Sequence, residues 1–382
     1  MPFSLAVIVN KDGSELGDSE TFLHAHINRM PCKVYSLIGN PGFRVVRDGS
    51  KGRNRFLVSR EIVPLGIRCI MRHTLGQTVA NQDTKALVRF FNKKLINVVL
   101  AEYGPTAVSV MEACRLANIP LISHFHGYDA YRESLIQDLS QPYKKLFDIS
   151  AAIVGVSRHM CNQLVDLGAD RNKVFHNPCG AEIPDKLGAT LSTSPARFFM
   201  VGRLVEKKAP FISLLAFSRL VSDVPDAVLE IVGDGPLKSS CMQLARALGI
   251  DNRVMFTGAK PHDYVLQSMA KATCFIQHSV MAPDGDMEGT PVGVLEAMGM
   301  GLPVVSTRHG GIQDVIEEDI TGVLVDEYDA EAMYNAMREI VRGPERAQEM
   351  GNRAQAAVLA QWTSEKSISR LWTIIQQAGG LS

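Results

Sequence analysis

Residues 274–298 read CFIQHSVMAPDGDMEGTPVGVLEAM, and this stretch holds one complete β-loop-α unit. The apolar run Cys274–Gln277 has the length of a buried strand, and Ser279–Gly289 is a loop rich in turn residues. Pro291 suits the first turn of a helix, which we predict over Val292–Met298. Ligands bind beyond the carboxyl ends of strands in open α/β sheets, so the loop is a candidate site.

The same alternation continues on both sides of this unit and restarts near residue 196. Apolar runs of strand length are separated by longer amphipathic stretches, which favours parallel sheets with helices on both faces. The predicted strands are Leu5–Val9, Val34–Ile38, Val98–Ala101, Leu121–Ser123 and Ala152–Val156 in the first half, and Arg197–Val201, Val228–Val232, Arg253–Phe256, Cys274–Gln277, Pro303–Ser306 and Gly322–Val325 in the second. The segment 185–195, DKLGATLSTSP, is small and polar, and we interpret it as a linker between two α/β halves.

Composition fits two folded domains. The chain has 382 residues, of which 46% are hydrophobic and 21% charged, and this is enough for two cores of ordinary size. Seven cysteines are dispersed without a C-x-x-C pair, which favours reduced thiols in a cytoplasmic protein over a disulfide framework or a metal cluster. No apolar run approaches the roughly 18–20 residues of a spanning helix, and the first ten residues indicate a strand rather than a signal peptide.

Charge is divided unevenly between the halves. Lys plus Arg and Asp plus Glu number 40 each, but residues 1–190 hold 23 basic and 17 acidic residues, and residues 191–382 hold 17 and 23. A positive first half could favour an anionic acceptor or the inner face of a membrane, and two lobes of complementary charge explain it equally well. The basic stretch 42–68 indicates either an anionic partner or a solvated surface, and it is the only support for nucleic-acid binding, which we do not expect.

Two cations follow another predicted strand end. Arg203 and Lys208 lie five residues apart in GRLVEKK, residues 202–208, directly after Arg197–Val201. A guanidinium can grip a phosphate with two donors, and an ammonium adds a compact charge. Alone, such a pair is more often a basic surface loop. Gly233, in the turn GDGP after the next strand, would let the backbone approach a ligand closely.

Two carboxylates complete the pattern. Glu288 lies near the end of the loop, and Glu296 lies one to two turns into the following helix. The amides of Thr290, Val292 and Gly293 would point out of the helix start toward an anion. Carboxylates accept hydrogen bonds from hydroxyls. Cations and carboxylates in neighbouring βα units therefore suit a ligand with a diphosphate at one end and hydroxyls at the other, such as a nucleoside diphosphate sugar.

Together these motifs resemble the retaining glycosyltransferases of the GT-B fold, family 4. The resemblance rests on GRLVEKK, on GDGP, on the Glu288 and Glu296 pair followed by EAMGMGLPVV, and on the Gly310-Gly311 turn leading to TGVLV. The stretches SETF, residues 19–22, and APDGDMEGTP, residues 282–291, further resemble bacterial members that build exopolysaccharides.

The resemblance implies two Rossmann-like domains facing across a cleft. An acceptor-binding domain would cover residues 1–187 and a donor-binding domain residues 196–361, and a terminal helix, 362–382, could pack back on the first. The implied activity is transfer of a sugar from a nucleoside diphosphate sugar to a carbohydrate or lipid-linked acceptor, in polysaccharide or glycoconjugate biosynthesis. UDP, GDP and ADP sugars all stay open as donors.

The resemblance also implies roles for residues of the second half. Arg203 and Lys208 would hold the diphosphate. Glu296 would bind the ribose hydroxyls, and Glu288 would act catalytically by binding the donor sugar beneath its transferred carbon. Gly233 would belong to the same donor site.

Two further roles fall in the first half. His126, in the HGYD stretch of residues 126–129, would face the cleft as a catalytic residue near the donor sugar. The family's first-loop glycine pair is replaced here, and Gly17 would approach the phosphates in its place. Pro291 stands where the family often has glycine, so one backbone donor is absent.

No resident metal or cofactor is expected, because Arg203 and Lys208 already supply positive charge. Asp284-Gly285-Asp286 has the D-x-D spacing that binds Mn²⁺ or Mg²⁺ in another glycosyltransferase fold. Its position, two residues before Glu288, favours a loop-shaping or sugar-contacting role instead.

Two other functions stay open. A nucleotide-sugar epimerase of similar fold would need no acceptor, and a non-catalytic sugar-nucleotide binding protein would not need His126 and Glu288. A nicotinamide dehydrogenase is disfavoured, because no G-x-G-x-x-G follows the first strand.

Overall fold

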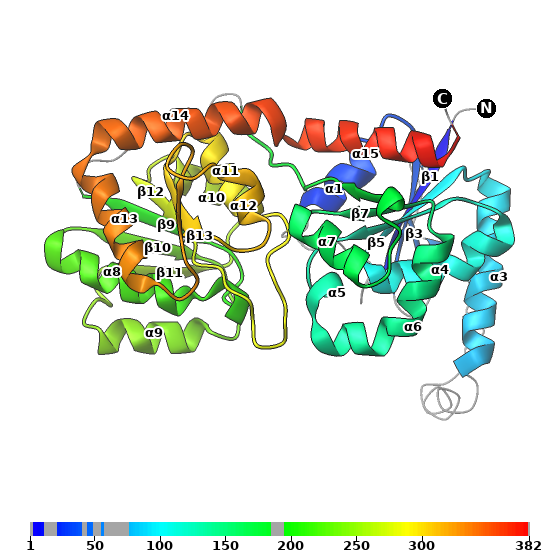
Figure 1. The fold of residues 1–382 in the computed structure, drawn as a ribbon, viewed down its shortest axis with the longest axis horizontal. Coiled ribbons are helices and arrows are strands. Elements are labelled where there is room, and N and C mark those ends of the chain that lie inside the picture. Colours follow the sequence, from blue (N-terminus) through cyan, green and yellow to red (C-terminus); the bar gives the residue numbers. More distant parts are fainter. Residues whose placement is uncertain are drawn as a thin grey trace.

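The computed structural model of this chain describes residues 3–10, 21–39, 44–48, 55–56, 76–184 and 195–380. Two helix-covered sheets lie side by side along the long axis of the molecule (Figure 1). We name the part built on the first sheet the first lobe and the part built on the second sheet the second lobe. Gly17, most of the predicted linker and most of the basic stretch 42–68 lie outside the described residues.

Within the described residues, the first sheet has eight strands in the order β4-β3-β2-β1-β5-β6-β7-β8. Their bounds are β1 Ser4–Val9, β2 Lys33–Ile38, β3 Arg44–Asp48, β4 Arg55–Phe56, β5 Val98–Glu102, β6 Leu121–Phe125, β7 Ala152–Gly155 and β8 Val174–His176. In the part of the sheet that runs β2-β1-β5-β6-β7-β8, every strand pairs in parallel with its neighbours.

The β3 and β4 edge corrects the prediction of a purely parallel sheet. β3 pairs antiparallel with β2, and β4 pairs antiparallel with β3. Ile38 and Arg44 are too close in sequence for the crossover of a dozen or more residues that a parallel pair needs. β8 was not predicted either, because Val174–His176 is too short to show a period.

The second sheet, as described over residues 195–380, has six strands, all parallel, in the order β11-β10-β9-β12-β13-β14. Their bounds are β9 Arg197–Val201, β10 Val228–Val232, β11 Val254–Gly258, β12 Cys274–Ile276, β13 Val304–Thr307 and β14 Val323–Val325. Each lies within two residues of its predicted position, so the alternating pattern was sufficient to place this sheet.

The helices fall between the strands as the alternation requires. Those of the first lobe are α1 Thr21–Asn28, α3 Gly76–Lys94, α4 Gly104–Ala117, α5 Tyr128–Tyr131, α6 Glu133–Ile149 and α7 Arg158–Asp166, followed by the 3-10 turn η1 Arg171–Lys173. Those of the second part of the chain are the 3-10 turn η2 Glu206–Lys208, α8 Pro210–Asp223, α9 Lys238–Ala247, α10 His262–Met269, α11 Val292–Gly299, α12 Ile312–Val315, α13 Ala330–Arg342, α14 Pro344–Gln361 and α15 Ser364–Ala378.

Both faces of each sheet are covered, which confirms the predicted layer arrangement. In the first lobe, α3, α4, α6 and α7 share a buried cluster with one face, and α1 and α15 share a cluster with the other. In the second lobe, α8, α9 and α13 pack on one face, and α10, α11 and α14 on the other.

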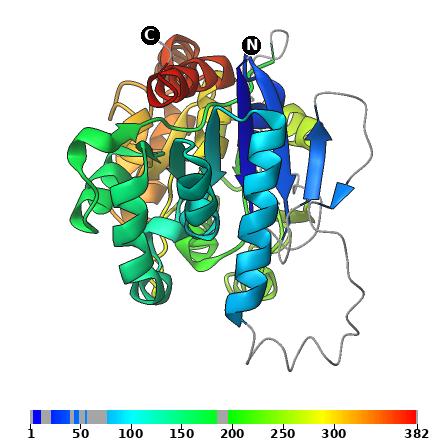
Figure 2. The ribbon, with the colours of Figure 1, turned by 90° about the vertical axis from the view of Figure 1, so that its right-hand side faces the viewer.

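The last two helices connect the lobes. α14 buries Ala354 and Val358 in the second lobe, whereas α15 buries Leu371 and Ile375 beside β1 in the first. Figure 2, viewed from the side of the first lobe, shows α15 next to the start of β1. Among the helices of the described residues, none is long and apolar enough to cross a membrane.

Candidate active site

Lys208 and Glu288 meet in a largely buried ion pair. Lys208 lies in η2 after β9, and Glu288 lies in the loop between β12 and α11. Lys208 Nζ is 2.7 Å from Glu288 Oε2, and the two side chains are 14% and 10% exposed. Burial alone would raise the pKa of Glu288, but the nearby charges of Lys208 and Lys207 lower it below its ordinary value. The structure therefore brings together a predicted phosphate ligand and the predicted sugar-binding carboxylate.

The loop carrying Glu288 is tied down by neighbouring charges. Lys207 Nζ lies 3.0 Å from Asp286 Oδ1 and donates to the carbonyl of Met287 at 3.0 Å. Arg132 Nε, from the first lobe, lies 2.9 Å from Asp284 Oδ2. Both aspartates of the D-x-D stretch thus pair with cations of the chain, as a loop-shaping role requires.

A histidine and a glutamate hold the backbone of this loop. The amide of Glu288 donates to Nε2 of His309 at 3.1 Å, and Nδ1 of the same ring lies 2.6 Å from Glu327 Oε1. The two bonds together place the ring proton on Nδ1. Sequence reasoning missed both residues, although His309 follows the carboxyl end of β13, where the strand-end rule places ligand-site residues.

Glu296 and Arg203 lie in different surroundings. Glu296 is a buried residue of α11, and its Oε1 is 2.9 Å from Nε2 of His262, the first residue of α10. This hydrogen bond raises the pKa of His262 despite partial burial. Arg203 is exposed, and the described part of the chain gives it no ion-pair partner. The predicted ribose carboxylate is thus already paired, whereas the first predicted phosphate cation is open to solvent.

Two glycines that were predicted for a donor site allow strand ends and a helix to touch. Gly233 has a φ of +134°, and a Cβ there would lie 1.9 Å from the carbonyl oxygen of Gly202. A Cβ on Gly293 would lie 3.3 Å from Cγ1 of Val201, at the end of β9. Gly233 therefore needs glycine for packing, whereas a Cβ at Gly293 would require only a small shift of the Val201 side chain.

The start of α11 differs from the prediction in one respect. The amide of Val292 donates to the carbonyl of Thr290 at 3.0 Å, so it is not an open donor toward the cleft. Thr290 instead links the lobes through its hydroxyl, which donates to the carbonyl of Val156 at 2.9 Å and accepts from the amide of Cys179 at 3.0 Å.

Asp129 explains the shape of the HGYD turn in the first lobe. This buried carboxylate accepts hydrogen bonds from the amides of His126, Gly127 and Gly104 at 3.0, 2.8 and 2.9 Å. Burial raises the pKa of Asp129, and these amides oppose the rise. The aspartate therefore fixes the turn to the start of α4.

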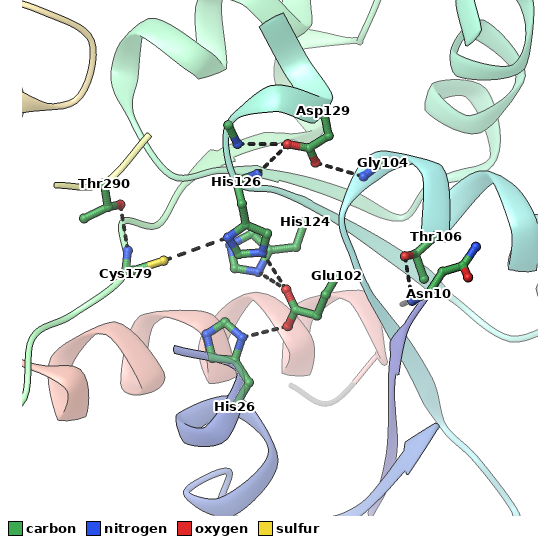
Figure 3. A network of polar contacts seen from close by, with 11 residues as sticks. Asn10, His26, Glu102, Gly104, Thr106, His124, His126, Asp129, Cys179 and Thr290 are labelled. Carbon is green, nitrogen blue, oxygen red and sulfur yellow. Dashed lines mark hydrogen bonds and ion pairs between the residues drawn. The ribbon is translucent and has the colours of Figure 1, made fainter. Parts of the chain in front are cut away.

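His126 is held in a network of buried polar groups (Figure 3). Its Nε2 is 2.7 Å from Oε2 of Glu102, at the end of β5, and its Nδ1 is 3.9 Å from Sγ of Cys179. His26 of α1 approaches the other oxygen of Glu102 at 2.7 Å, and His124 lies 3.1 Å from Oε2. We predicted that His126 faces the cleft, whereas the structure shows its side chain only 6% exposed and bonded to Glu102. Sequence reasoning missed both Glu102 and His26.

The two predicted catalytic residues lie on facing loops. A Cβ on Gly289 would lie 2.2 Å from the carbonyl oxygen of His126, and one on Gly127 would lie 3.7 Å from Nζ of Lys207. The loop that carries Glu288 therefore abuts the turn that carries His126.

One cluster has the composition of a metal site. Ligand atoms of His26, Glu102 and His124 all lie within 4.8 Å of one another, and two imidazoles with a carboxylate can hold zinc. However, His26 Nδ1 and Glu102 Oε1 are 2.7 Å apart, whereas two ligands about 2.0–2.1 Å from a tetrahedral zinc lie roughly 3.3 Å apart. The spacing fits a hydrogen-bonded network better than a metal centre.

Family models match both lobes. The model "Glycosyl transferases group 1" matches residues 186–357, and the model "Glycosyltransferase Family 4" matches residues 45–183. The amylovoran biosynthesis glycosyltransferase AmsK of Erwinia amylovora is 31% identical over 58% of this chain and 55% of its own length. The chain thus spans little more than half the length of the curated relatives it matches.

Solved structures share the whole architecture. Anabaena HepE in complex with UDP and glucose has a TM-score of 0.74 at 16% identity, covering 97% of this chain and 99% of HepE. Sucrose-phosphate synthase from Thermosynechococcus elongatus has a TM-score of 0.73 at 16% identity, covering both chains completely. At this identity the likeness shows the fold, and the predicted arrangement of two Rossmann-like lobes is confirmed.

Proposed function

Because this chain belongs to the family 4 glycosyltransferases of the GT-B fold, we propose that it moves a sugar from a nucleoside diphosphate sugar to an acceptor hydroxyl. One observation carries the proposal: Lys208 forms a 2.7 Å ion pair with Glu288, whose loop abuts the turn of His126. A cation for phosphate, a carboxylate for hydroxyls and a histidine thus meet between the two lobes.

The ion pair suggests how the donor enters. A diphosphate would compete with Glu288 for the ammonium of Lys208, and the exposed guanidinium of Arg203 would add a second contact. Once Lys208 turns toward phosphate, the carboxylate of Glu288 is free to accept hydrogen bonds from the sugar. Negative charge that develops on the leaving diphosphate would then meet two fixed cations, and this lowers the barrier to transfer.

Glu296 would receive the ribose. Its carboxylate is held by His262, which leaves acceptor capacity for the ribose hydroxyls. The backbone at the ends of β9 and β10, where Gly202 and Gly233 touch, would contact the rest of the nucleotide.

We further propose that the transfer retains the anomeric configuration. Burial raises the pKa of the Cys179 thiol to about 12, so this group stays protonated and is a poor nucleophile. Glu288 is paired with Lys208, and the edge of the His126 ring is held by Glu102. These states suit same-face attack by the acceptor hydroxyl, with the leaving phosphate taking its proton.

For the substrates, we propose a UDP-sugar donor and a carbohydrate or lipid-linked acceptor of polysaccharide biosynthesis. AmsK is named for amylovoran biosynthesis, and HepE is described with UDP and glucose. Contact with the inner face of a membrane would bring the protein to a lipid-linked acceptor, and the positive charge of residues 1–190 supports this.

The test begins with a thermal-shift screen of UDP, GDP, ADP and their sugars, since a ligand that binds the folded state alone raises its melting temperature. The sugar that stabilises the protein most is then used in a transfer assay, with and without a chelator, and the anomeric configuration of the product is determined by NMR. We expect transfer with retention that survives the chelator. Isomerised sugar nucleotide appearing without acceptor would favour an epimerase instead.

Two variants test the residue roles. Glu288→Gln and Arg203→Ala should each lower transfer by about 100-fold, the range found when one charged donor or acceptor of a transition state is removed. Glu206→Gln changes an exposed carboxylate in the same turn as Lys208 and serves as the control. Near-normal turnover in both site variants would refute the roles.

A further inference from the structure

Glu102 is a buried carboxylate surrounded by imidazoles. It is the last residue of β5, it is fully buried, and His26 and His126 contact its two oxygens at 2.7 Å. Figure 3 shows the three histidines on one side of the carboxylate, with His126 between Glu102 and Cys179. A carboxylate in such a place is costly unless its partners hold it as an anion.

The network keeps Glu102 ionised. Burial would raise its pKa, but the nearby rings of His26 and His124 and the hydrogen bonds to it lower that pKa well below the ordinary value. An ionised carboxylate only accepts hydrogen bonds, so each ring nitrogen that bonds to it must carry a hydrogen. These nitrogens are Nδ1 of His26 and Nε2 of His126.

The second nitrogen of His126 is therefore a lone-pair acceptor. Burial, together with the nearby ring of His124, lowers the pKa of His126 to about 3, so the ring is neutral and carries one hydrogen only. With that hydrogen on Nε2, Nδ1 is bare. Nδ1 faces Cys179 Sγ at 3.9 Å, and the thiol stays protonated, as a weak donor to Nδ1 should.

Aromatic neighbours pack around the ring of His126. The ring centroids of Phe22, Tyr103 and His124 lie 4.3, 4.9 and 4.2 Å from that of His126. These rings pack against His126, and Glu102 bonds to its Nε2 edge. The position of the single hydrogen therefore decides whether Nδ1 accepts or donates a hydrogen bond. Its Nδ1 edge lies toward Cys179, whose amide donates to Thr290 of the second lobe.

We infer that Glu102 is a positioning residue: by accepting the Nε2 hydrogen of His126, it makes Nδ1 of that ring a hydrogen-bond acceptor for a sugar hydroxyl. The inference rests on the proposed function for the identity of the hydroxyl. A ring nitrogen without hydrogen accepts a hydrogen bond from a hydroxyl, but it cannot donate one to a phosphate oxygen. His126 therefore contacts the sugar and not the diphosphate. His26 supports this arrangement by holding the other oxygen of Glu102.

The direct test is imidazole nitrogen NMR on the full chain labelled with ¹⁵N-histidine. The His126 signals are identified by their loss in His126→Gln. In the wild type we expect hydrogen on Nε2 and none on Nδ1. In Glu102→Gln, where a neutral amide can donate as well as accept, we expect a mixture of tautomers or the opposite one. A wild-type ring with its hydrogen on Nδ1, or an unchanged tautomer in Glu102→Gln, overturns the inference.

Kinetics supply the second arm. Glu102→Gln should lower kcat by about 10–100-fold, by analogy with the loss of a carboxylate that orients a metal-ligating histidine, with the Kd for the nucleoside diphosphate unchanged. Ser123→Ala is the matched control, because it removes a buried hydrogen bond of the neighbouring strand, to Ser150 at 2.8 Å, without touching Glu102. Equal losses of kcat in both variants would mean that Glu102 acts only through packing, and this would overturn the inference.

The two arms separate the inference from the proposed function. A wild-type protein that transfers no sugar refutes the proposed function, and the NMR result still decides whether Glu102 sets the tautomer. An active wild type with hydrogen on Nδ1 of His126 refutes the inference alone.

Discussion

At the scale of single residues, a buried charge in the candidate site depends on a partner of opposite charge. Lys208 and Glu288 are each largely buried, and each is the other's partner. Removing one member of such a pair leaves an uncompensated buried charge, which costs far more than the pair contributes. Each side chain therefore depends on the other for its stability in the folded protein.

Lys208→Met tests how strongly the two side chains depend on each other, through its effect on the free energy of unfolding. We expect the free energy of unfolding to fall by about 3–5 kcal/mol at neutral pH, because Glu288 is left buried and charged. The double variant Lys208→Met/Glu288→Leu should recover most of the loss, since an apolar pair replaces both charges. Urea unfolding measures both values. A double variant as unstable as the single one would contradict the argument.

The loss of stability in Lys208→Met should depend on pH in a direction that follows from the pKa of Glu288. The folded-state pKa of Glu288 lies below its ordinary value. The contribution of the pair is therefore present above the unfolded-state pKa and is lost as pH falls through the folded-state value. The stability difference between wild type and Lys208→Met should accordingly narrow in acid.

At the scale of elements, the loop between β12 and α11 is the piece that joins the two halves of the site. It carries Glu288, it is tied to η2 through Lys207, and it contacts the first lobe through Arg132 and the turn at His126. Gly289 permits the last contact, because a side chain there would collide with the carbonyl of His126.

Gly289→Ala should therefore separate the facing loops. Its Cβ would lie 2.2 Å from backbone, so the loop must move, and a displacement of about 1 Å can cost about 100-fold in rate. Transfer should fall by that order while the nucleotide still binds the second lobe in calorimetry. Gly343→Ala is the control, because the nearest atom to its Cβ would be 3.4 Å away. Full activity of Gly289→Ala would show that the loops need not touch.

At the scale of the molecule, the first lobe is built from two parts of the chain that are separated in sequence by the second lobe. The chain leaves the first lobe after β8, builds the second lobe, and returns through α14 so that α15 packs beside β1. The core of the first lobe is thus completed by α15, which follows the second lobe in the sequence.

Leu371→Ala should weaken the first lobe from this distant position. Leu371 is fully buried in the cluster that contains Leu5 and Val7, and a buried Leu→Ala change costs about 2–5 kcal/mol. Hydrogen exchange should rise in β1 and β5. Leu359→Ala, on the exposed side of α14 at 49% exposure, should change stability by about 0.5 kcal/mol at most. Equal effects of the two substitutions would mean that α15 is not part of the core.

The sequence by itself determined the repeating elements and the residues of the second lobe's strand ends. Strand positions follow from local periodicity, and Lys208 and Glu288 stand out because each lies in the segment that follows a predicted strand. The sequence also indicated His126, through its short HGYD stretch. It did not reveal the antiparallel β3 and β4 edge, which has no local period to read.

Only the tertiary structure decided which ionisable groups form hydrogen bonds or ion pairs with one another. Glu102 is 76 residues from His26 and 24 from His126, and His309 is 21 residues from Glu288, so no local spacing records these contacts. Periodicity reports which face of an element is buried, because burial repeats along the chain. A hydrogen bond between distant residues depends on sheet order and lobe packing, and these exist only once the chain has folded.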